Sequence, residues 1–122
     1  MKTFDLVALG ASAKLNARGK TFAQLGNRTL SVSRFSKHPR WELHPHDDEY
    51  LQVIDGEIEV TLLLEGGQRR SVLRPGIACI IPKNVWHSPV PRGPVTLLSM
   101  ADYSETEVSD AEDPRASRRK SR

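Results

Sequence analysis

The sequence predicts an all-β fold in a single domain. Between residues 40 and 100, short runs rich in Val, Ile and Leu alternate with turn residues at regular intervals, as they do in β-sandwiches and β-barrels. Asp55-Gly56 stands between two such runs and is a strong signal for a hairpin turn, because type I′ turns require a positive φ. The chain has 122 residues and one cysteine, which suits one domain whose core needs no disulfides.

The expected strands are bounded by Gly, Pro, Asn or Asp, the residues that favour turns. In order along the chain, the predicted strands cover residues 30–35, 51–53, 58–64, 71–73, 77–81, 85–90 and 95–100. The N-terminal part is less regular. Residues 4–8 fit either a strand or a short helix, and two or three turns of helix are expected around residues 11–25.

Charge is distributed in blocks along the chain. Residues 1–40 hold eight lysines or arginines and one acid, residues 102–113 hold six acids and no base, and residues 115–122 are again basic. The polar tail lacks apolar periodicity, which predicts disorder over residues 104–122. No aromatic residues are interleaved with the basic N-terminal part to stack on bases, which argues against a nucleic-acid partner.

The hydropathy pattern predicts a cytoplasmic protein without membrane contact. No apolar run is long enough to cross a bilayer, and the apolar stretch at residues 6–9 is too short for a secretory signal. The strand at residues 58–64 is apolar at almost every position, which indicates burial on both faces and predicts a homodimer. The expected organisation is an N-terminal arm (residues 1–39) that completes the fold, a core (40–103) and the disordered tail.

Three of the four histidines lie in two short clusters. His44 and His46 are two residues apart, so on an extended strand both would point to one face. Glu49 begins the next strand and would bring a carboxylate beside them. His87 follows the turn at Pro82-Lys83-Asn84. Three imidazoles and one carboxylate suit a divalent transition metal, and Fe, Mn, Ni, Zn and Cu all fit this ligand set.

These residues resemble the two sequence motifs of the cupin superfamily. The first motif is matched by His44-Pro45-His46, Glu49 and Gly56. The second motif is matched by Gly76, Pro82-Lys83-Asn84 and His87. The resemblance covers about residues 40–100. It implies a single-domain cupin double-stranded β-helix, which is a jelly-roll barrel, with a metal bound by His44, His46, Glu49 and His87.

Three departures from the cupin motifs affect the expected site. Only two residues separate His46 from Glu49, one fewer than in the cupin pattern, so Asp48 competes with Glu49 as the carboxylate ligand. Asn84 replaces a glycine, which is a mild change because asparagine adopts a positive φ more readily than most residues. His38 stands where the first motif has a glycine, in a loop rich in Lys and Arg that is expected at the surface.

Other residues near the histidines are expected to support the site or to pack in the fold rather than to bind the metal. Glu42 lies two residues before His44 and would either support the ligands or transfer protons. Trp41 and Trp86 fall on the opposite face from the neighbouring histidines and are expected to pack between the sheets or at a subunit contact rather than to line the pocket. Cys79 is expected to be a small buried hydrophobe rather than a nucleophile.

Two classes of function stay open. In the first, the protein is a metal-dependent enzyme that acts on a small molecule, of the dioxygenase or isomerase type, because open coordination positions let a metal polarise an oxygen or bind dioxygen. In the second, it binds a small ligand or a metal without turnover, as a sensor or storage module. The sequence assigns no catalytic residue and contains no dinucleotide-binding or phosphate-loop motif, so the fold alone does not decide between these classes.

Overall fold

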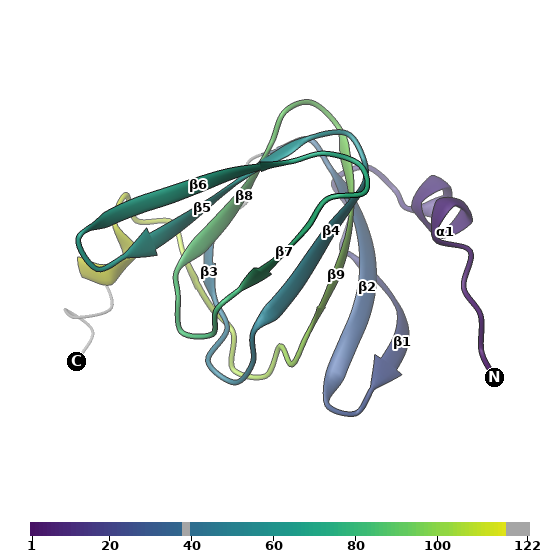
Figure 1. Ribbon diagram of the computed structural model, residues 1–122, viewed down its shortest axis with the longest axis horizontal. Coiled ribbons are helices and arrows are strands. Elements are labelled where there is room, and N and C mark those ends of the chain that lie inside the picture. Colours follow the sequence, from purple (N-terminus) through teal and green to yellow (C-terminus); the bar gives the residue numbers. More distant parts are fainter. Residues whose placement is uncertain (38–39, 117–122) are drawn as a thin grey trace.

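In the computed structural model, two five-stranded antiparallel sheets face each other, and one short helix lies outside them (Figure 1). The structure describes residues 1–37 and 40–116, so His38 and the basic end of the tail lie outside the described residues. The elements are α1 (Leu6–Ser12), β1 (Lys20–Leu25), β2 (Arg28–Phe35), β3 (Trp41–Leu43), β4 (Glu49–Asp55), β5 (Ile58–Leu64), β6 (Gly67–Leu73), β7 (Ala78–Ile81), β8 (His87–Pro91), β9 (Val95–Ala101) and β10 (Glu107–Ser109).

The strand order confirms the predicted all-β class. The first sheet has the order β1-β2-β9-β4-β7, and the second has the order β10-β3-β8-β5-β6. Consecutive strands cross repeatedly from one sheet to the other, which is the jelly-roll arrangement. The described strands form two separate sheets rather than one continuous ring, so this jelly roll is a β-sandwich.

The turn at Asp55-Gly56 has the predicted conformation but not the predicted role. Gly56 adopts a positive φ of 86°. The turn does not close a hairpin, however, because β4 pairs with β7 and β9 whereas β5 pairs with β6 and β8. It carries the chain from one sheet to the other. The hairpin prediction was wrong because a local turn signal does not specify the partner of the next strand.

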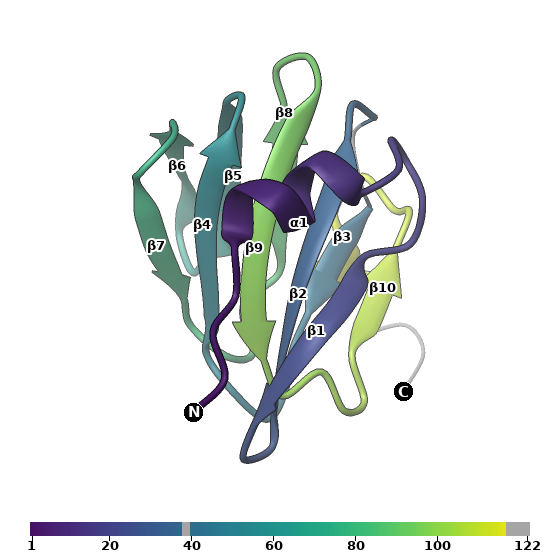
Figure 2. The same ribbon diagram turned by 90° about the vertical axis from the view of Figure 1, so that its right-hand side faces the viewer.

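The N-terminal segment also differs from the expectation. The helix is α1, which begins after Asp5, whose side chain accepts the backbone N–H of Ala8 at 3.0 Å. Residues 20–25 form β1 rather than helix, because their backbone pairs with β2. α1 lies against the outer face of the first sheet (Figure 2). No helix among the described residues has the length and hydropathy needed to cross a bilayer.

The space between the sheets is divided into an apolar end and a polar end. The apolar end is the hydrophobic core, formed by the inward-facing residues Leu51, Val53, Ile58, Val60, Leu73, Ile81, Val95 and Leu97. Cys79 is partly buried against this core, and burial raises the pKa of its thiol to about 11. This apolar environment fits the predicted role of Cys79 as a small hydrophobe. The polar end, between β2, β9, β3 and β8, contains the candidate site.

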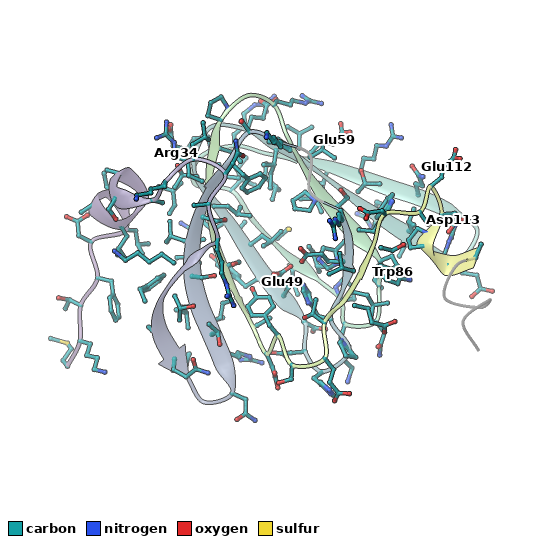
Figure 3. The ribbon with its side chains drawn as sticks, turned by 180° about the vertical axis from the view of Figure 1, so that it is seen from behind. Arg34, Glu49, Glu59, Trp86, Glu112 and Asp113 are labelled. Atoms are coloured by element: carbon teal, nitrogen blue, oxygen red, sulfur yellow. The ribbon has the colours of Figure 1, made fainter. Side chains whose placement is uncertain are left out.

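The outer face of the second sheet carries a smaller apolar cluster. It is formed by Leu43, Leu63 and Trp86, with Trp41 packed against them. Both tryptophans therefore lie away from the pocket, as predicted, but on the outer face of the second sheet and not between the sheets. Figure 3 shows Trp86 on the same side of the molecule as the C-terminal segment. This cluster explains why β5 is apolar on both faces within one chain.

The C-terminal segment is ordered where the sequence predicts disorder. β10 pairs with β3 over residues 107–109. Pro114 is fully buried, and the guanidinium of Arg115 donates to the carbonyl of Leu64 at 2.9 Å. The prediction of disorder is therefore wrong for this segment, because backbone pairing with a distant strand leaves no hydropathy signal. Residues 117–122 lie outside the described part of the chain.

The homodimer stays a prediction that now lacks its original support. Leu63, on the outer face of β5, is only 6% exposed within its own chain. The remaining exposed apolar side chains near the edge strand β7 are Ile77 and Ile80, which are 43% and 59% exposed. Light scattering at micromolar concentration tests the dimer. A mass of twice 13.6 kDa confirms it, and a mass of 13.6 kDa contradicts it.

Candidate metal centre

Two histidines and two glutamates meet at the polar end of the interior. We call them the His/Glu centre: Glu42, His44, Glu49 and His87. Glu42 lies on β3 and pairs in register with His87, the first residue of β8. His44 directly follows β3, and Glu49 begins β4 in the opposite sheet. The sandwich therefore brings together residues that are far apart in the sequence.

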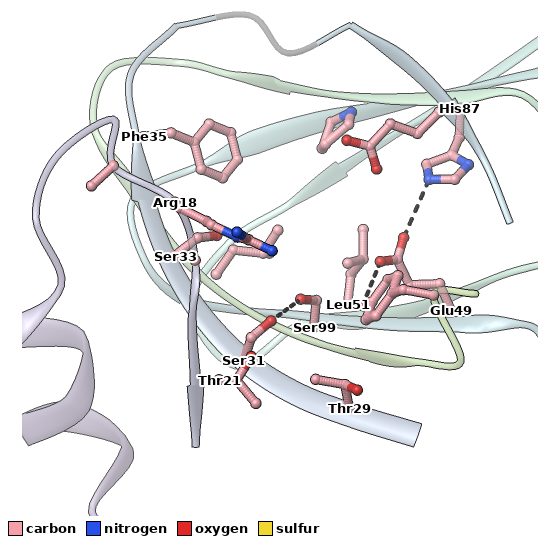
Figure 4. A pocket seen from close by; sticks show the side chains of 16 residues that line it. Arg18, Thr21, Thr29, Ser31, Ser33, Phe35, Glu49, Leu51, His87 and Ser99 are labelled. Carbon is pink, nitrogen blue, oxygen red and sulfur yellow. Dashed lines mark hydrogen bonds and ion pairs between the residues drawn. The ribbon is translucent and has the colours of Figure 1, made fainter. Parts of the chain in front are cut away.

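The distances show that the side chains converge on one point. Glu49 Oε1 lies 3.2 Å from His87 Nε2 (Figure 4). The same oxygen lies 3.4 Å from His44 Nε2. Glu42 Oε2 lies 3.6 Å from His44 Nε2. Both histidines and Glu49 are buried, whereas the Glu42 side chain is 39% exposed. Three of the predicted ligands, His44, Glu49 and His87, are therefore brought together.

The structure does not bring His46 to the His/Glu centre. β3 ends at Leu43, and the next residues form bends rather than an extended strand. The rule that residues i and i+2 share a face therefore does not apply to His44 and His46. The His46 side chain is 44% exposed, and its Nε2 lies 2.7 Å from Glu105 Oε1.

Of the two carboxylates considered, the structure places Glu49 and not Asp48 beside the histidines. Asp48 Oδ1 accepts the backbone N–H of Lys83 at 2.9 Å, at the surface. Asp47 pairs with Arg28 at 2.8 Å and is likewise away from the histidines. Asn84 adopts a positive φ of 62°, so it does take the conformation of the glycine that it replaces. The turn containing Asn84 is also held by its backbone N–H, which donates to the carbonyl of His44.

Hydrogen bonds at Nδ1 determine what each imidazole presents to the centre. His44 Nδ1 lies 2.8 Å from the hydroxyl of Thr106, and that hydroxyl donates to the carbonyl of Tyr103 at 2.8 Å. Since the hydroxyl hydrogen of Thr106 is already donated to Tyr103, the hydroxyl oxygen accepts a hydrogen bond from His44 Nδ1–H. His87 Nδ1 donates to the carbonyl of Val85 at 3.0 Å. In its neutral form each ring therefore carries its lone pair on Nε2, facing the centre. When His87 is protonated, its Nε2–H instead donates to Glu49 Oε1 at 3.2 Å.

One of these nitrogens has no hydrogen-bond partner at all. His44 Nε2 is buried, and its 3.4 Å contact with Glu49 lacks hydrogen-bonding geometry. An unpartnered buried polar atom costs about 1–3 kcal/mol. A ligand to a metal would use this lone pair. The orphaned nitrogen is thus the clearest sign that the centre fits a metal ion.

The ionisation of the centre follows from burial and mutual charge. Burial opposes ionisation of Glu49, but its contacts with His44 and His87 outweigh this and hold its pKa at about 2. Burial also opposes protonation of His87, yet the hydrogen bond and charge of Glu49 raise the pKa of that imidazole. For Glu42, burial and the charge of Glu49 raise the pKa. Glu49 is therefore ionised at neutral pH and keeps a negative charge available for a cation.

Sequence reasoning missed two residues that support the centre from the C-terminal segment. The hydroxyl of Tyr103 donates to Glu49 Oε2 at 2.7 Å, and its ring packs edge-on against His44 with a centroid distance of 5.0 Å. Thr106 orients His44, as described above. Both follow β9 by a few residues in a segment without apolar periodicity, and nothing in the sequence connects them to histidines about sixty residues earlier.

A cavity of about 590 Å³ opens onto the centre. Glu42, Glu49, His87 and Tyr103 lie at its inner end. Its walls carry hydroxyl groups from Thr21, Thr29, Ser31, Ser33 and Ser99 as well as the apolar side chains of Phe35, Leu51 and Leu97. A cavity of this size with a few convergent polar groups suits a small-molecule ligand.

The ligand atoms present are two imidazole nitrogens and carboxylate oxygens. One ligand atom each from Glu42, His44 and His87 lies within 4.8 Å of the other two. Glu49 Oε1 contacts both histidines of this group. This N₂O₂ set differs from the expected N₃O set because Glu42 takes the place of His46. It fits a divalent transition metal.

Comparison with known proteins agrees with this architecture. The family described as "Cupin domain" matches residues 34–101. Protein NMB1881 from Neisseria meningitidis has a TM-score of 0.69 at 20% identity, over 81% of this chain and 97% of that one. A cupin-2 domain containing protein from Shewanella frigidimarina has a TM-score of 0.71 at 15% identity, over 80% and 92% of the two chains.

A third similar structure is an enzyme. Hydroquinone 1,2-dioxygenase from Sphingomonas sp. TTNP3, solved with 4-hydroxybenzoate bound, has a TM-score of 0.63 at 19% identity, over 78% of this chain and 70% of that one. At these identities the similarity concerns the fold. No curated protein matches the sequence of the chain.

Proposed function

Because the chain belongs to the cupin domain family, we propose that it binds a divalent transition metal at the His/Glu centre and acts with this metal as an enzyme on a small molecule. The observation that carries the proposal is the buried, unpartnered Nε2 of His44, which faces the same point as His87 Nε2 and Glu49. His44, His87 and Glu49 are the proposed ligands, with Glu42 as a fourth.

The donor set narrows the choice of metal. Imidazole suits Zn, Cu, Fe and Ni, whereas carboxylate suits Mn. A second carboxylate in place of a third imidazole makes the set more suitable for Mn than the expected N₃O set would be. A six-coordinate metal held by these four residues would have two further positions for water or a small molecule, as a metal-dependent reaction requires.

The bound metal would supply Lewis acidity, polarising an oxygen of the ligand. Residues of the protein would hold the metal ligands in position and bind the small molecule. Glu42 lines the cavity and would serve as the fourth ligand of the metal. Tyr103 holds Glu49 in place through its 2.7 Å hydrogen bond. The cavity would hold the ligand and limit its contact with water.

Reconstitution tests the metal and the reaction in turn. The purified protein is loaded separately with Mn, Fe, Ni, Zn or Cu, and the bound metal is measured by elemental analysis. Small oxo-acids, diketones and phenols are then assayed with and without oxygen. Dioxygen uptake supports a dioxygenase, and anaerobic turnover supports an isomerase. Stoichiometric metal without any turnover favours the alternative function, a non-catalytic sensor or storage module, and absence of bound metal contradicts the metal centre.

Replacement of Thr106 by valine is expected to weaken metal binding by roughly 10–100-fold, the usual effect of losing a group that orients a metal ligand. The substitution removes the acceptor of His44 Nδ1–H. Chelator competition measures the affinity. Thr106→Ser keeps the hydroxyl and should restore most of the affinity. Equal affinities of the valine and serine variants would show that this hydrogen bond does not orient the ligand.

A further inference from the structure

A second, smaller pocket adjoins the cavity on the side of the N-terminal segment. Its volume is about 230 Å³, and four cationic side chains line it: Lys14, Arg18, Lys20 and Arg34. We call it the basic pocket. Ala17, Arg18 and Ser33 line both the basic pocket and the cavity of the His/Glu centre, so the two hollows are neighbours that share part of their wall.

The cations of the basic pocket are not neutralised by acids of the chain. Other arginines form ion pairs: Arg28 with Asp47, Arg74 with Glu57, and Arg92 with Glu57 and Glu59. Among the described residues, no ion pair joins the four cations of the basic pocket to an acid, and no acid lines the pocket. Four like charges around a concave surface repel one another and create a positive potential that an anion would offset.

The basic pocket is built by the fold rather than by a loose arm. The backbone N–H of Asn16 donates to the carbonyl of Arg34 at 2.7 Å, and Leu15 forms a parallel bridge with Arg34. The amide side chain of Asn16 accepts from the backbone N–H of Ser36 at 2.9 Å and donates to its hydroxyl at 3.2 Å. These contacts fasten the segment that carries Lys14 and Arg18 to the end of β2.

Charge is therefore separated between the His/Glu centre and the basic pocket. The inner end of the cavity has two carboxylates, Glu42 and Glu49, while Arg18 projects into the cavity from the opposite side (Figure 4). Hydroxyl groups such as those of Ser31, Ser33 and Ser99 lie along the wall between these ends. With the proposed divalent metal bound, the charges of Glu42 and Glu49 are balanced, and the positive charge of the basic pocket is the unbalanced charge of the two hollows. An anionic group of a ligand is therefore attracted to the basic pocket.

We propose that the basic pocket binds the anionic group of the small-molecule ligand, a phosphate or a cluster of carboxylates, while the uncharged reactive end of the same ligand lies at the His/Glu centre. The position of the reactive end at the His/Glu centre rests on the proposed function, whereas the anion site is inferred from the basic pocket alone. Arginine suits this role because its planar guanidinium binds phosphate or carboxylate oxygens in pairs.

Calorimetric titration with pyrophosphate and with citrate tests the anion site. The protein is first stripped of metal by a chelator, which is then removed by gel filtration. Arg18→Ala and Arg34→Ala are expected to weaken binding at least 10-fold. The matched control is Arg69→Ala on β6, which removes an exposed positive charge away from the pocket and should leave the affinity within twofold of the original. Tighter binding of pyrophosphate indicates a phosphate group, and tighter binding of citrate indicates carboxylates.

Three results would overturn the inference. They are absence of binding of both anions to the original protein, equal weakening by all three substitutions, and binding of a single-stranded oligonucleotide that neither small anion displaces. Asn16→Ala adds a test of positioning and should weaken anion binding although it removes no charge. Because these titrations use metal-free protein, their failure leaves the metal centre untouched. Failure to load metal, in turn, leaves the anion site intact and contradicts the proposed function alone.

Discussion

His87→Ala is expected to abolish metal binding, lowering the measured content from about one ion per chain to nearly none. His87 supplies one of the two imidazole nitrogens at the centre, and its Nε2 lies 3.2 Å from Glu49 Oε1. Without it, one imidazole and two carboxylates remain, and the affinity for a transition metal falls with the loss of a nitrogen ligand. Elemental analysis after reconstitution and desalting measures the result.

His46→Ala is the matched control for this experiment. It removes a histidine that the spacing of the sequence predicts as a ligand but that the structure places at the surface beside Glu105. We expect it to keep its full metal content. Loss of metal from the His46 variant, or full retention in the His87 variant, would contradict the centre described above. Circular dichroism of both variants shows whether a loss of metal reflects a loss of fold.

Gly56→Ala is expected to destabilise the protein by at least about 3 kcal/mol, a large effect for a single substitution. The φ of Gly56 is 86°, and a Cβ there would lie 2.4 Å from the carbonyl oxygen of Pro94 and 2.9 Å from Val95 Cα. These are backbone atoms, so a change of rotamer cannot relieve the contact. The strained left-handed conformation alone costs roughly 1–2 kcal/mol for a residue with a Cβ.

Gly26→Ala separates the cost of the left-handed backbone conformation from the cost of the steric contact. Gly26 also has a positive φ, 61°, but a Cβ there would meet nothing within 4 Å. Its substitution should therefore cost only the conformational part, about 1–2 kcal/mol. Urea denaturation of the two variants measures the difference in unfolding free energy. Similar losses in both would show that the close approach to Pro94 is relieved by movement of the backbone.

The sequence predicted the strands well but not their partners. The apolar run at residues 58–64 coincides with β5, because alternation and turn residues are local properties. The Asp55-Gly56 turn was assigned to a hairpin and instead joins the two sheets. β10 went unnoticed because its three residues are stabilised by pairing with β3, an interaction that has no counterpart in the hydropathy of either segment.

The candidate site, like the fold, could be predicted only in part from the sequence. By itself, the sequence determined the all-β class, the resemblance to cupins and the candidacy of His44, Glu49 and His87, since these depend on residue type and spacing. Only the tertiary structure decided that Glu42 and not His46 joins them, that Tyr103 and Thr106 hold them, and that Arg18 projects into the same cavity. The physical reason is that the direction of a side chain depends on where its strand ends and what packs across the sandwich, which residue spacing does not record.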